Sequence, residues 1–186
     1  MALDLCPCWI GYLLINPLRK LGQNPDRILG PHVRPGMTVL EIGPAMGFFT
    51  LPLARMVGPR GKVVCVDVQE AMLRSLHKRA VKAGIADRIV PRLCPPASLG
   101  VDDYAGRIDF ALAFAVVHEV PNPTGLFTEV ARALKAGARF LVAEPRGHVT
   151  ADGFAQTLAL ARAQGLDLAD RPRIALSHAA LLVKRR

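Results

Sequence analysis

The chain has 186 residues, a length that suits one domain with a full hydrophobic core. Hydrophobic residues make up 51% of the sequence and charged residues only 21%, which excludes a disordered chain. The formal net charge is +9, but the basic residues are scattered along predicted helix faces without interleaved aromatic residues, so we do not expect a nucleic-acid substrate.

Neither a membrane span nor a secretory signal is predicted. The longest apolar runs, such as FALAFAVVH, are far shorter than the roughly 18 residues that a membrane span requires. The N-terminus carries Asp4 and no leading Lys or Arg, which is not typical of a secretory signal. The four cysteines form no recognisable disulfide pattern, so we expect a reducing, cytoplasmic location.

From residue 37 onward, predicted strands and helices alternate. Near-continuous apolar strands separated by amphipathic helices predict a parallel sheet that is covered by helices on both faces. The strands are expected at 37–43, 61–68, 88–94, 108–117 and 138–145, and the helices at 48–57, 69–84, 123–137 and 150–165.

Single residues mark the limits of several elements. Pro52 falls in the first turn of its helix, where proline is tolerated, and Gly84 and Gly137 are expected to end the helices before them. Thr150 or Asp152 is expected to cap the helix at 150–165. Pro91 predicts that the third strand lies at an edge of the sheet or is weak, because proline cannot donate a ladder hydrogen bond.

The two ends of the chain differ in character from its centre. Residues 166–186 have no room for a helix and predict two short strands with a turn near 175–177, the last strand being antiparallel. Residues 1–32 predict one or two short helices that act as a lid. The expected division is therefore an N-terminal helical segment at 1–32 and a domain at 33–186.

The stretch VLEIGPAMGFFTLPLAR, residues 39–55, predicts a strand, a tight turn and the start of a helix, as in a nucleotide-binding loop. Small residues occupy positions 43, 45 and 47. The next strand ends at Asp67, twenty residues past Gly47, where a carboxylate can accept hydrogen bonds from both hydroxyls of a ribose.

Glu41, at the end of the first strand, decides between two kinds of adenosyl ligand. A carboxylate beside the glycine loop repels a pyrophosphate at the helix N-terminus. The same carboxylate suits the ammonium and sulfonium charges of S-adenosylmethionine, which has no phosphate. In addition, the glycines at 43 and 47 do not match the spacing G-x-G-x-x-G.

Four motifs in the expected order resemble those of class I S-adenosylmethionine-dependent methyltransferases. EIGPAMG is similar to their first motif and VVCVDV to their second strand. RIDFALAFAVVHEV resembles the fourth-strand motif, and EVARALKAGARFLVAEP the helix and strand that follow. The resemblance runs from about Val33 to the end and is nearest to the branch that includes ubiquinone/menaquinone-biosynthesis methyltransferases. It implies an α/β, Rossmann-like fold with a seven-stranded, mostly parallel sheet.

The resemblance also implies roles for individual residues around S-adenosylmethionine. A simpler interpretation is that Gly43 and Gly47 are turn glycines and that Asp67 is a helix cap. The resemblance implies that the methionyl part is surrounded by Glu41, Gly43, Ala45 and Gly47 and that the ribose is held by Asp67. It also implies that the adenine lies between Val68 and Gln69 and that the sulfonium faces the backbone of Ala113 and Phe114.

Two residues depart from the family pattern. Ala45 replaces the middle glycine, which costs little at negative φ and about 1 kcal/mol or more at positive φ. Pro95 stands where the family often has an acid that meets the adenine amine, and proline has no carboxylate. We expect cofactor binding to be retained.

His118 and Glu119 follow the fourth strand, where an acceptor would meet the methyl group. His118 is the candidate general base; alternatively, it packs against or caps the loop before Pro121. Glu119 either orients His118 or faces water. His148, after the fifth strand, is a candidate substrate-binding residue on the same rim.

The N-terminal CPCW adds a possible acceptor site. Cys6 and Cys8, together with Cys94, would form a thiol cluster for a thiophilic acceptor, or they are apolar residues of a packed lid. C-x-C lacks the paired spacing of a zinc site, so no metal site is predicted. Trp9 and Tyr12 are candidates for lining an apolar acceptor pocket.

Three functions remain open on the sequence. The first is methyl transfer to a small, apolar or thiophilic acceptor, which the absence of an inserted substrate domain favours. The second is a methyltransferase-fold partner subunit with little or no catalysis, for which Ala45 and Pro95 speak. The third is nucleic-acid methylation, which only the net charge supports, because AVVHEV stands where amino-methylating enzymes carry an Asn/Asp-Pro-Pro-Tyr motif.

Overall fold

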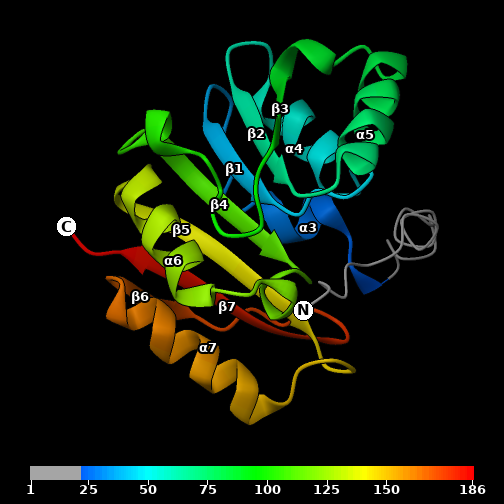
Figure 1. Ribbon diagram of the computed structural model, residues 1–186. Coiled ribbons are helices and arrows are strands. Elements are labelled where there is room, and N and C mark those ends of the chain that lie inside the picture. Colours follow the sequence, from blue (N-terminus) through cyan, green and yellow to red (C-terminus); the bar gives the residue numbers. More distant parts are fainter. Residues whose placement is uncertain (1–21) are drawn as a thin grey trace. The chain divides into compact units, whose positions relative to one another are not determined.

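A computed structural model describes residues 22–186, and Figure 1 shows their helices and strands. The first described helix, α3 (Pro25–Leu29), begins after Asn24, whose side chain accepts hydrogen bonds from two backbone N–H groups of the first turn. Most of the predicted lid segment, 1–32, lies outside the described residues. Its separation from a domain at 33–186 therefore stays a prediction.

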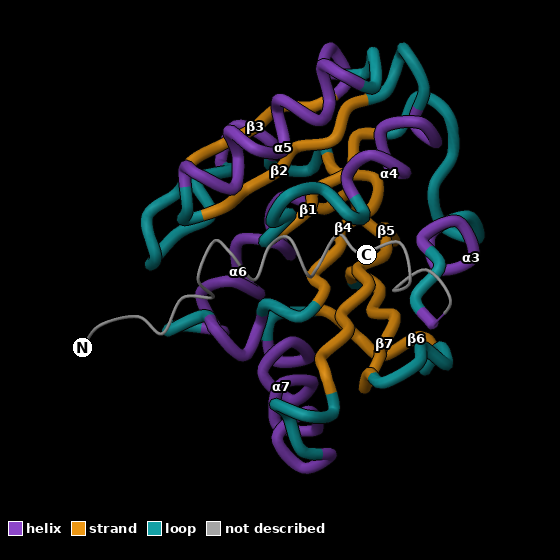
Figure 2. The backbone as a smooth tube through the Cα atoms, turned by 90° about the vertical axis from the view of Figure 1, so that its right-hand side faces the viewer, coloured by secondary structure: helices purple, strands orange, loops and turns teal. Residues whose placement is uncertain are grey.

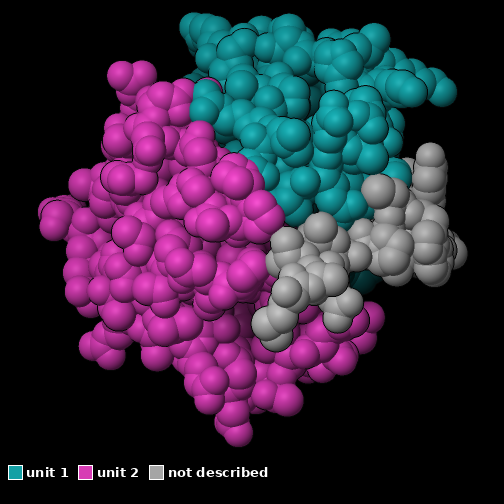
Figure 3. Space-filling view, viewed as in Figure 1, with its two compact units in different colours: residues 1–94 teal, residues 95–186 magenta. Residues whose placement is uncertain are grey.

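The chain divides into two compact units, which have different colours in Figure 3. The first unit ends at Cys94, and the second is Pro95–Arg186. Seven strands form one sheet in the order β3-β2-β1-β4-β5-β7-β6. With helices around this sheet and an antiparallel strand at the chain's end, the predicted Rossmann-like α/β fold is confirmed. The strands are β1 (Thr38–Ile42), β2 (Lys62–Asp67), β3 (Ile89–Leu93), β4 (Ile108–Phe114), β5 (Leu134–Pro145), β6 (Leu166–Asp170) and β7 (Ser177–Lys184).

Parallel strands form the sheet of the first unit. β1 pairs with β2 and β2 with β3, and the apolar side chains of β1 and β2 are buried along almost their whole length. Burial on both faces explains why these strands are near-continuous runs of Val, Leu and Ile. Helices α4 (Thr50–Val57) and α5 (Glu70–Lys82) pack against them, and Gly84 with φ +68° follows the end of α5 as predicted.

The edge position of β3 confirms the expectation drawn from Pro91. β3 is the first strand in the sheet order and pairs with β2 alone. Pro91 lies opposite Cys65 in this pairing, and its missing N–H group faces the side of β3 that has no strand partner.

The sheet of the second unit combines one parallel pair with two antiparallel pairs. β4 is parallel to β5, whereas β7 runs antiparallel to both β5 and β6. The predicted terminal pair of strands is therefore present, joined by a loop over 171–176. Helices α6 (Pro123–Ala133) and α7 (Ala151–Ala163) pack against each other, as Figure 2 shows. Thr150 caps α7 as predicted, because its hydroxyl accepts a hydrogen bond from the Gly153 N–H at 3.1 Å.

The prediction that the helix at 123–137 ends at Gly137 is wrong. α6 ends at Ala133, and β5 begins at Leu134, whose side chain is completely buried and whose backbone is extended. The pairing then jumps from Ile108 opposite Leu134 to Phe110 opposite Arg139. Gly137, with φ +74°, lies in this irregular part of β5. Burial of Leu134 beside β4 outweighs the helix propensity of the residues that follow it.

Three phenylalanines anchor the core of the second unit. Phe110, Phe127 and Phe140 are among the largest fully buried side chains. The rings of Phe127 on α6 and Phe140 on β5 meet edge to face, with centroids 6.1 Å apart at 60°. None of the helices within residues 22–186 has the length and apolar character needed to cross a membrane.

Candidate functional site

The loop after β1 has a left-handed backbone at each of its three small residues. Gly43 has φ +64°, Ala45 +48° and Gly47 +87°. Two of these positions carry glycine, which adopts positive φ without a steric penalty. Ala45 carries a methyl group, which strains this left-handed backbone by about 1 kcal/mol or more.

Position 47 requires glycine because of its positive φ and because there is no room for a Cβ atom. A Cβ atom at this position would approach Cδ1 of Leu76 to 2.5 Å. Leu76 lies on α5 and is completely buried, so it has little room to move. The loop and α5 therefore pack directly against each other.

Hydrogen bonds fix the shape of this loop. The N–H of Gly43 donates to the carbonyl of Val66 at 2.9 Å, which ties the loop to β2. The N–H of Gly47 donates to the carbonyl of Pro44 at 2.9 Å and closes the turn. From α5, the guanidinium of Arg79 donates to the carbonyl of Met46. A loop held from both neighbouring elements presents its backbone groups without further ordering.

Glu41 is a buried carboxyl group at the end of β1. It is 3% exposed, and burial raises its pKa from 4.5 to about 7. The Cys65 thiol donates to Oε2 of Glu41 at 3.7 Å and lowers this pKa. The Thr50 hydroxyl lowers the pKa of Glu41 more strongly than the thiol does. Because this hydroxyl makes no hydrogen bond of ordinary length and angle within residues 22–186, we attribute its effect to its dipole. Without a ligand, Glu41 is thus poised between its neutral and ionised forms near neutral pH.

Asp67 closes β2 and connects it to both neighbouring segments. Its Oδ1 accepts a hydrogen bond from the Gln69 N–H at 2.8 Å, just before α5 begins. Burial raises its pKa, while the backbone N–H groups of Gln69, Ala45 and Val68 oppose this rise. The interpretation of Asp67 as the helix cap is wrong, because the N-cap of α5 is Gln69 and no side chain of the described residues makes a capping hydrogen bond there. The carboxylate also faces the glycine loop, as a ribose-binding residue must.

In the second unit, a buried carboxylate holds a histidine. Glu144, at the end of β5, is 1% exposed and accepts hydrogen bonds from the N–H groups of Val116 at 3.2 Å and Val117 at 2.9 Å. The Nδ1 atom of His118 also contacts Oε2 of Glu144 within hydrogen-bonding distance. Glu144 therefore fixes both the backbone of the turn after β4 and the ring of His118.

This contact sets the protonation of His118. The hydrogen bond to Glu144 raises the pKa of His118, and partial burial opposes the rise. Because a carboxylate can only accept a hydrogen bond, Nδ1 carries the proton in the neutral ring, and Nε2 is left as the basic atom. Oε1 of Glu119 lies 3.9 Å from Nε2. His118 is thus oriented by Glu144, not by Glu119 as predicted from the sequence.

The structure brings two further predicted residues, His148 and Glu119, next to His118 of this pair. The rings of His118 and His148 lie with centroids 5.5 Å apart at 39°, and Glu119 borders the same group. The turn carries a second strained alanine, Ala115 at φ +57°, whose N–H donates to the carbonyl of Ala143 at 2.7 Å.

The other predicted residues have varied surroundings. Ala113 and Phe114 are the last residues of β4, where Ala113 is completely buried and Phe114 half-buried. Pro95 is exposed. The predicted roles of Trp9, Tyr12, Cys6 and Cys8 fall outside the described residues.

Two further residues are Cys94, which the sequence analysis singled out, and Glu144, which it did not. Cys94 is buried and forms no disulfide within residues 22–186, and no group of three or more His, Cys, Asp or Glu in the same range is placed to hold a metal ion. Sequence analysis missed Glu144. The available signal was an acidic residue at the end of a buried strand, directly before Pro145.

Comparison with known proteins identifies the family of this chain. The sequence model of a family described as a methyltransferase domain matches residues 34–170. The chain belongs to this methyltransferase family. The predicted resemblance to class I S-adenosylmethionine-dependent methyltransferases of the ubiquinone/menaquinone branch is thereby confirmed.

Two relatives and one solved structure illustrate the similarity. Demethylmenaquinone methyltransferase of Symbiobacterium thermophilum is 32% identical over 138 residues, which are 72% of this chain and 54% of that protein. The ubiquinone/menaquinone biosynthesis C-methyltransferase UbiE of Bordetella avium is 31% identical over 115 residues, 61% of this chain and 43% of that protein. The methyltransferase chain therefore spans about half the length of these relatives. In fold, it is similar to a SAM-dependent methyltransferase from Aquifex aeolicus, with a TM-score of 0.86 at 20% identity over 96% of this chain and 99% of that chain.

Ala45→Gly is expected to stabilise this methyltransferase by about 1 kcal/mol, because it removes the strain of a left-handed alanine. The control is Ala159→Gly, at an exposed helical position of α7, which should destabilise by about 0.5–1 kcal/mol. Urea denaturation of both variants measures the two signs. A loss of stability in Ala45→Gly would show that the methyl group contributes more by packing than it costs in strain.

Glu41→Gln is expected to stabilise the protein at high pH. Since the pKa of Glu41 rises from 4.5 to about 7 on folding, the folded state binds more protons in this window, and stability falls as pH rises through it. Glutamine removes this dependence. Relative to wild type, the variant should gain about 2–3 kcal/mol of unfolding free energy between about pH 5 and pH 8. An equal difference in unfolding free energy between the variant and wild type at the two pH values would contradict the burial of an ionisable Glu41.

Glu144→Gln is expected to lower the pKa of the His118 ring, as followed by NMR titration, because it removes the largest cause of the raised value. Glu119→Gln is the control and should lower that pKa less, since its carboxylate is 3.9 Å away and is the smallest cause. A raised pKa in the folded state stabilises the fold below about pH 6.5, and this stabilisation disappears as pH rises through the folded value. The stability deficit of Glu144→Gln should therefore shrink as the solution becomes alkaline. Equal pKa shifts in the two variants would contradict the assigned pair.

Proposed function

We propose that this chain catalyses S-adenosylmethionine-dependent methyl transfer to a small molecule. The observation that carries this proposal is the pairing of a fixed loop over 43–47 with Asp67, at the ends of two neighbouring parallel strands. Ligands of open parallel sheets bind at this end of the strands. Membership of the methyltransferase family supports the same activity.

The residues of the first unit fit the charges of S-adenosylmethionine. Glu41 is buried beside the loop and has only a thiol and a hydroxyl as neutral polar neighbours. A nearby cation favours the ionised carboxylate and lowers its pKa, which opposes the rise caused by burial. The ammonium and sulfonium groups of S-adenosylmethionine provide such charge, whereas the pyrophosphate of a dinucleotide would be repelled.

Asp67 suits the ribose of the same ligand. One of its oxygens is engaged by the Gln69 N–H, and the carboxylate has further acceptor sites for hydroxyl groups. Val68 and Gln69, which flank the adenine in this proposal, are half-buried directly after it. Ala113 and Phe114 are assigned to the sulfonium side on the resemblance of the fourth-strand motif.

We also propose that His118, in the second unit, is the base that a protonated acceptor requires. When bound, the cofactor supplies an electrophilic methyl group on a sulfonium centre. Glu144 holds the Nδ1 proton of His118, which leaves Nε2 free to accept a proton from the acceptor. The hydrogen bond from Glu144 also stabilises the imidazolium that this transfer forms. His148 and Glu119 border the same ring and are proposed to contact the acceptor.

An acidic hydroxyl on an apolar ring is the acceptor class that suits this arrangement. Such a group must lose a proton before or during methyl transfer, which gives His118 a task. The two relatives named for demethylmenaquinone and for ubiquinone/menaquinone biosynthesis support a quinol-type acceptor. Trp9 and Tyr12 stay proposed as apolar contacts to it.

Calorimetric titration with S-adenosylmethionine and S-adenosylhomocysteine tests the proposal. Wild type and Asp87→Asn, an exposed control in the same unit, should bind both ligands with micromolar affinity. Asp67→Asn should weaken binding by about tenfold or more, because it loses the charge-assisted hydrogen bonds to the ribose.

Binding is followed by an acceptor screen with reduced quinones and simple phenols. No binding to folded wild-type protein would contradict the enzymatic function and favour a methyltransferase fold that serves as a partner subunit. Binding that Asp67→Asn and Asp87→Asn weaken equally would place the cofactor elsewhere.

A further inference from the structure

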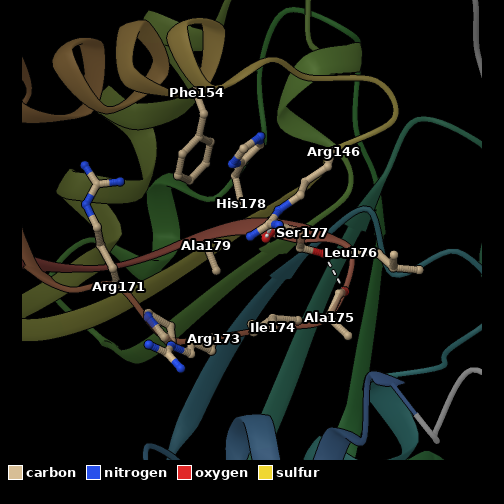
Figure 4. Close-up of a pocket in the computed structure, with 11 residues that line it drawn as sticks. Arg146, Phe154, Arg171, Arg173, Ile174, Ala175, Leu176, Ser177, His178 and Ala179 are labelled. Atoms are coloured by element: carbon tan, nitrogen blue, oxygen red, sulfur yellow. Dashed lines mark hydrogen bonds between the residues drawn. The ribbon is translucent and has the colours of Figure 1, made fainter.

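A separate cavity in the second unit is lined by cationic side chains. It has a volume of about 420 Å³ and lies among the end of β5, the start of α7 and the loop that leads into β7 (Figure 4). Its size falls within the range of roughly 300–1,000 Å³ that is usual for small-molecule sites. Arg146, Arg171, Arg173 and His178 contribute nitrogen atoms to its lining.

Within residues 22–186, the guanidinium groups of Arg146, Arg171 and Arg173 have no carboxylate partner, although the backbone N–H of Arg171 donates to Oδ1 of Asp170 at 2.7 Å. The Nε of Arg146 donates to the carbonyl of Ser177 at 3.2 Å, and its terminal nitrogens make no hydrogen bond in the described part of the chain. The guanidinium groups of Arg171 and Arg173 have neither an ion pair nor a hydrogen bond there. Elsewhere in this unit, by contrast, Arg132 pairs with Asp102. Three uncompensated positive charges around one cavity raise the local concentration of anions.

The loop that carries two of these arginines has a fixed shape. Leu176 adopts φ +60°, and its carbonyl accepts a hydrogen bond from the Arg146 N–H at 3.0 Å. The Ser177 N–H donates to the carbonyl of Ile174 at 3.2 Å and closes the turn. Left-handed leucine is strained and persists only where its surroundings enforce it. The arginines are therefore held on a shaped turn.

Apolar and aromatic groups form the base of the cavity. Phe154 of α7 is buried and stacks on the ring of His178, with centroids 5.7 Å apart at 22°. Figure 4 shows the two rings beside each other. Ile174 is also buried. A site with a cationic rim over an apolar base suits an anionic group attached to a carbon skeleton.

We propose that this cavity is a binding site for the phosphate or diphosphate group of a small organic ester. Guanidinium groups form paired hydrogen bonds with phosphate oxygens, and a group with several oxygens and two or more negative charges can engage more than one arginine. A single carboxylate would leave most of the positive charge uncompensated. The proposal is independent of methyl transfer, because none of the lining residues belongs to the loop at 43–47 or to the His118–Glu144 pair.

Titration of the full-length protein with sodium pyrophosphate, followed by calorimetry and NMR, tests this site. Wild type should bind one equivalent, with chemical-shift changes centred on Arg146 and residues 171–179. The double variant Arg171→Gln/Arg173→Gln should bind at least about tenfold more weakly. Arg55→Gln/Arg60→Gln removes the same charge from exposed arginines of the first unit and should bind like wild type.

Three results would overturn the proposal. They are the absence of saturable binding, equal weakening in the two double variants, and shift changes spread over the whole basic surface. Arg146→Gln, whose backbone N–H bond to Leu176 is retained, checks the site if the double variant does not fold.

Sedimentation with vesicles distinguishes a free ester from a lipid headgroup. Vesicles of phosphatidylcholine with phosphatidic acid are compared with vesicles of phosphatidylcholine alone. Pyrophosphate binding with no preference for the anionic vesicles assigns the site to a free ester. Pyrophosphate binding together with retention on the anionic vesicles, abolished by Arg171→Gln/Arg173→Gln, assigns it to a lipid phosphate. Retention on vesicles without pyrophosphate binding would overturn the proposed pocket.

Discussion

Burial of carboxylates at the ends of the strands is the constraint on which both functional clusters depend. A carboxylate removed from water remains charged only if hydrogen bonds replace its hydration. Glu144 obtains them from backbone N–H groups of the turn after β4 and from His118. Asp67 obtains them from the Gln69 N–H and its neighbours. In each case the carboxylate orders a loop that carries functional residues. Glu41 has the Cys65 thiol as a donor in place of backbone N–H groups, and burial raises its pKa to about 7.

The same strand ends also hold strained backbone. Ala45 follows β1 and Ala115 follows β4, and both have the left-handed conformation that glycine adopts without cost. Strain of this kind persists where the surrounding hydrogen bonds determine the backbone, as the bonds from Gly43 and Ala115 to neighbouring strands do here. Local stability is therefore reduced at these two strand ends. The rest of each unit compensates through its buried apolar core.

Much of the fold was predictable from the sequence because it depends on local patterns. Apolar runs located the strands, and Pro91 located an edge. The end of α6 was not predictable, since Leu134 leaves the helix to fill a place beside β4 that only the tertiary structure defines. The pair of His118 and Glu144 was missed for a related reason. These residues are separated by 26 positions, and no spacing rule connects them. The conformation of Ala45 likewise required coordinates.

The neutral fraction of Glu41 has a thermodynamic consequence for ligand binding. Burial raises the pKa of Glu41 to about 7, so its protonated form is populated near neutral pH, whereas the Cys65 thiol keeps its proton because burial raises its pKa well above the usual value. On the proposed function, a cationic ligand that binds the ionised form displaces the Glu41 proton into solvent. The observed binding enthalpy then includes the heat of protonating the buffer and changes from one buffer to another. Below pH 7, the apparent affinity falls as acidity rises, by up to about tenfold per pH unit. The proposed cofactor site would thus couple ligand occupancy to proton exchange.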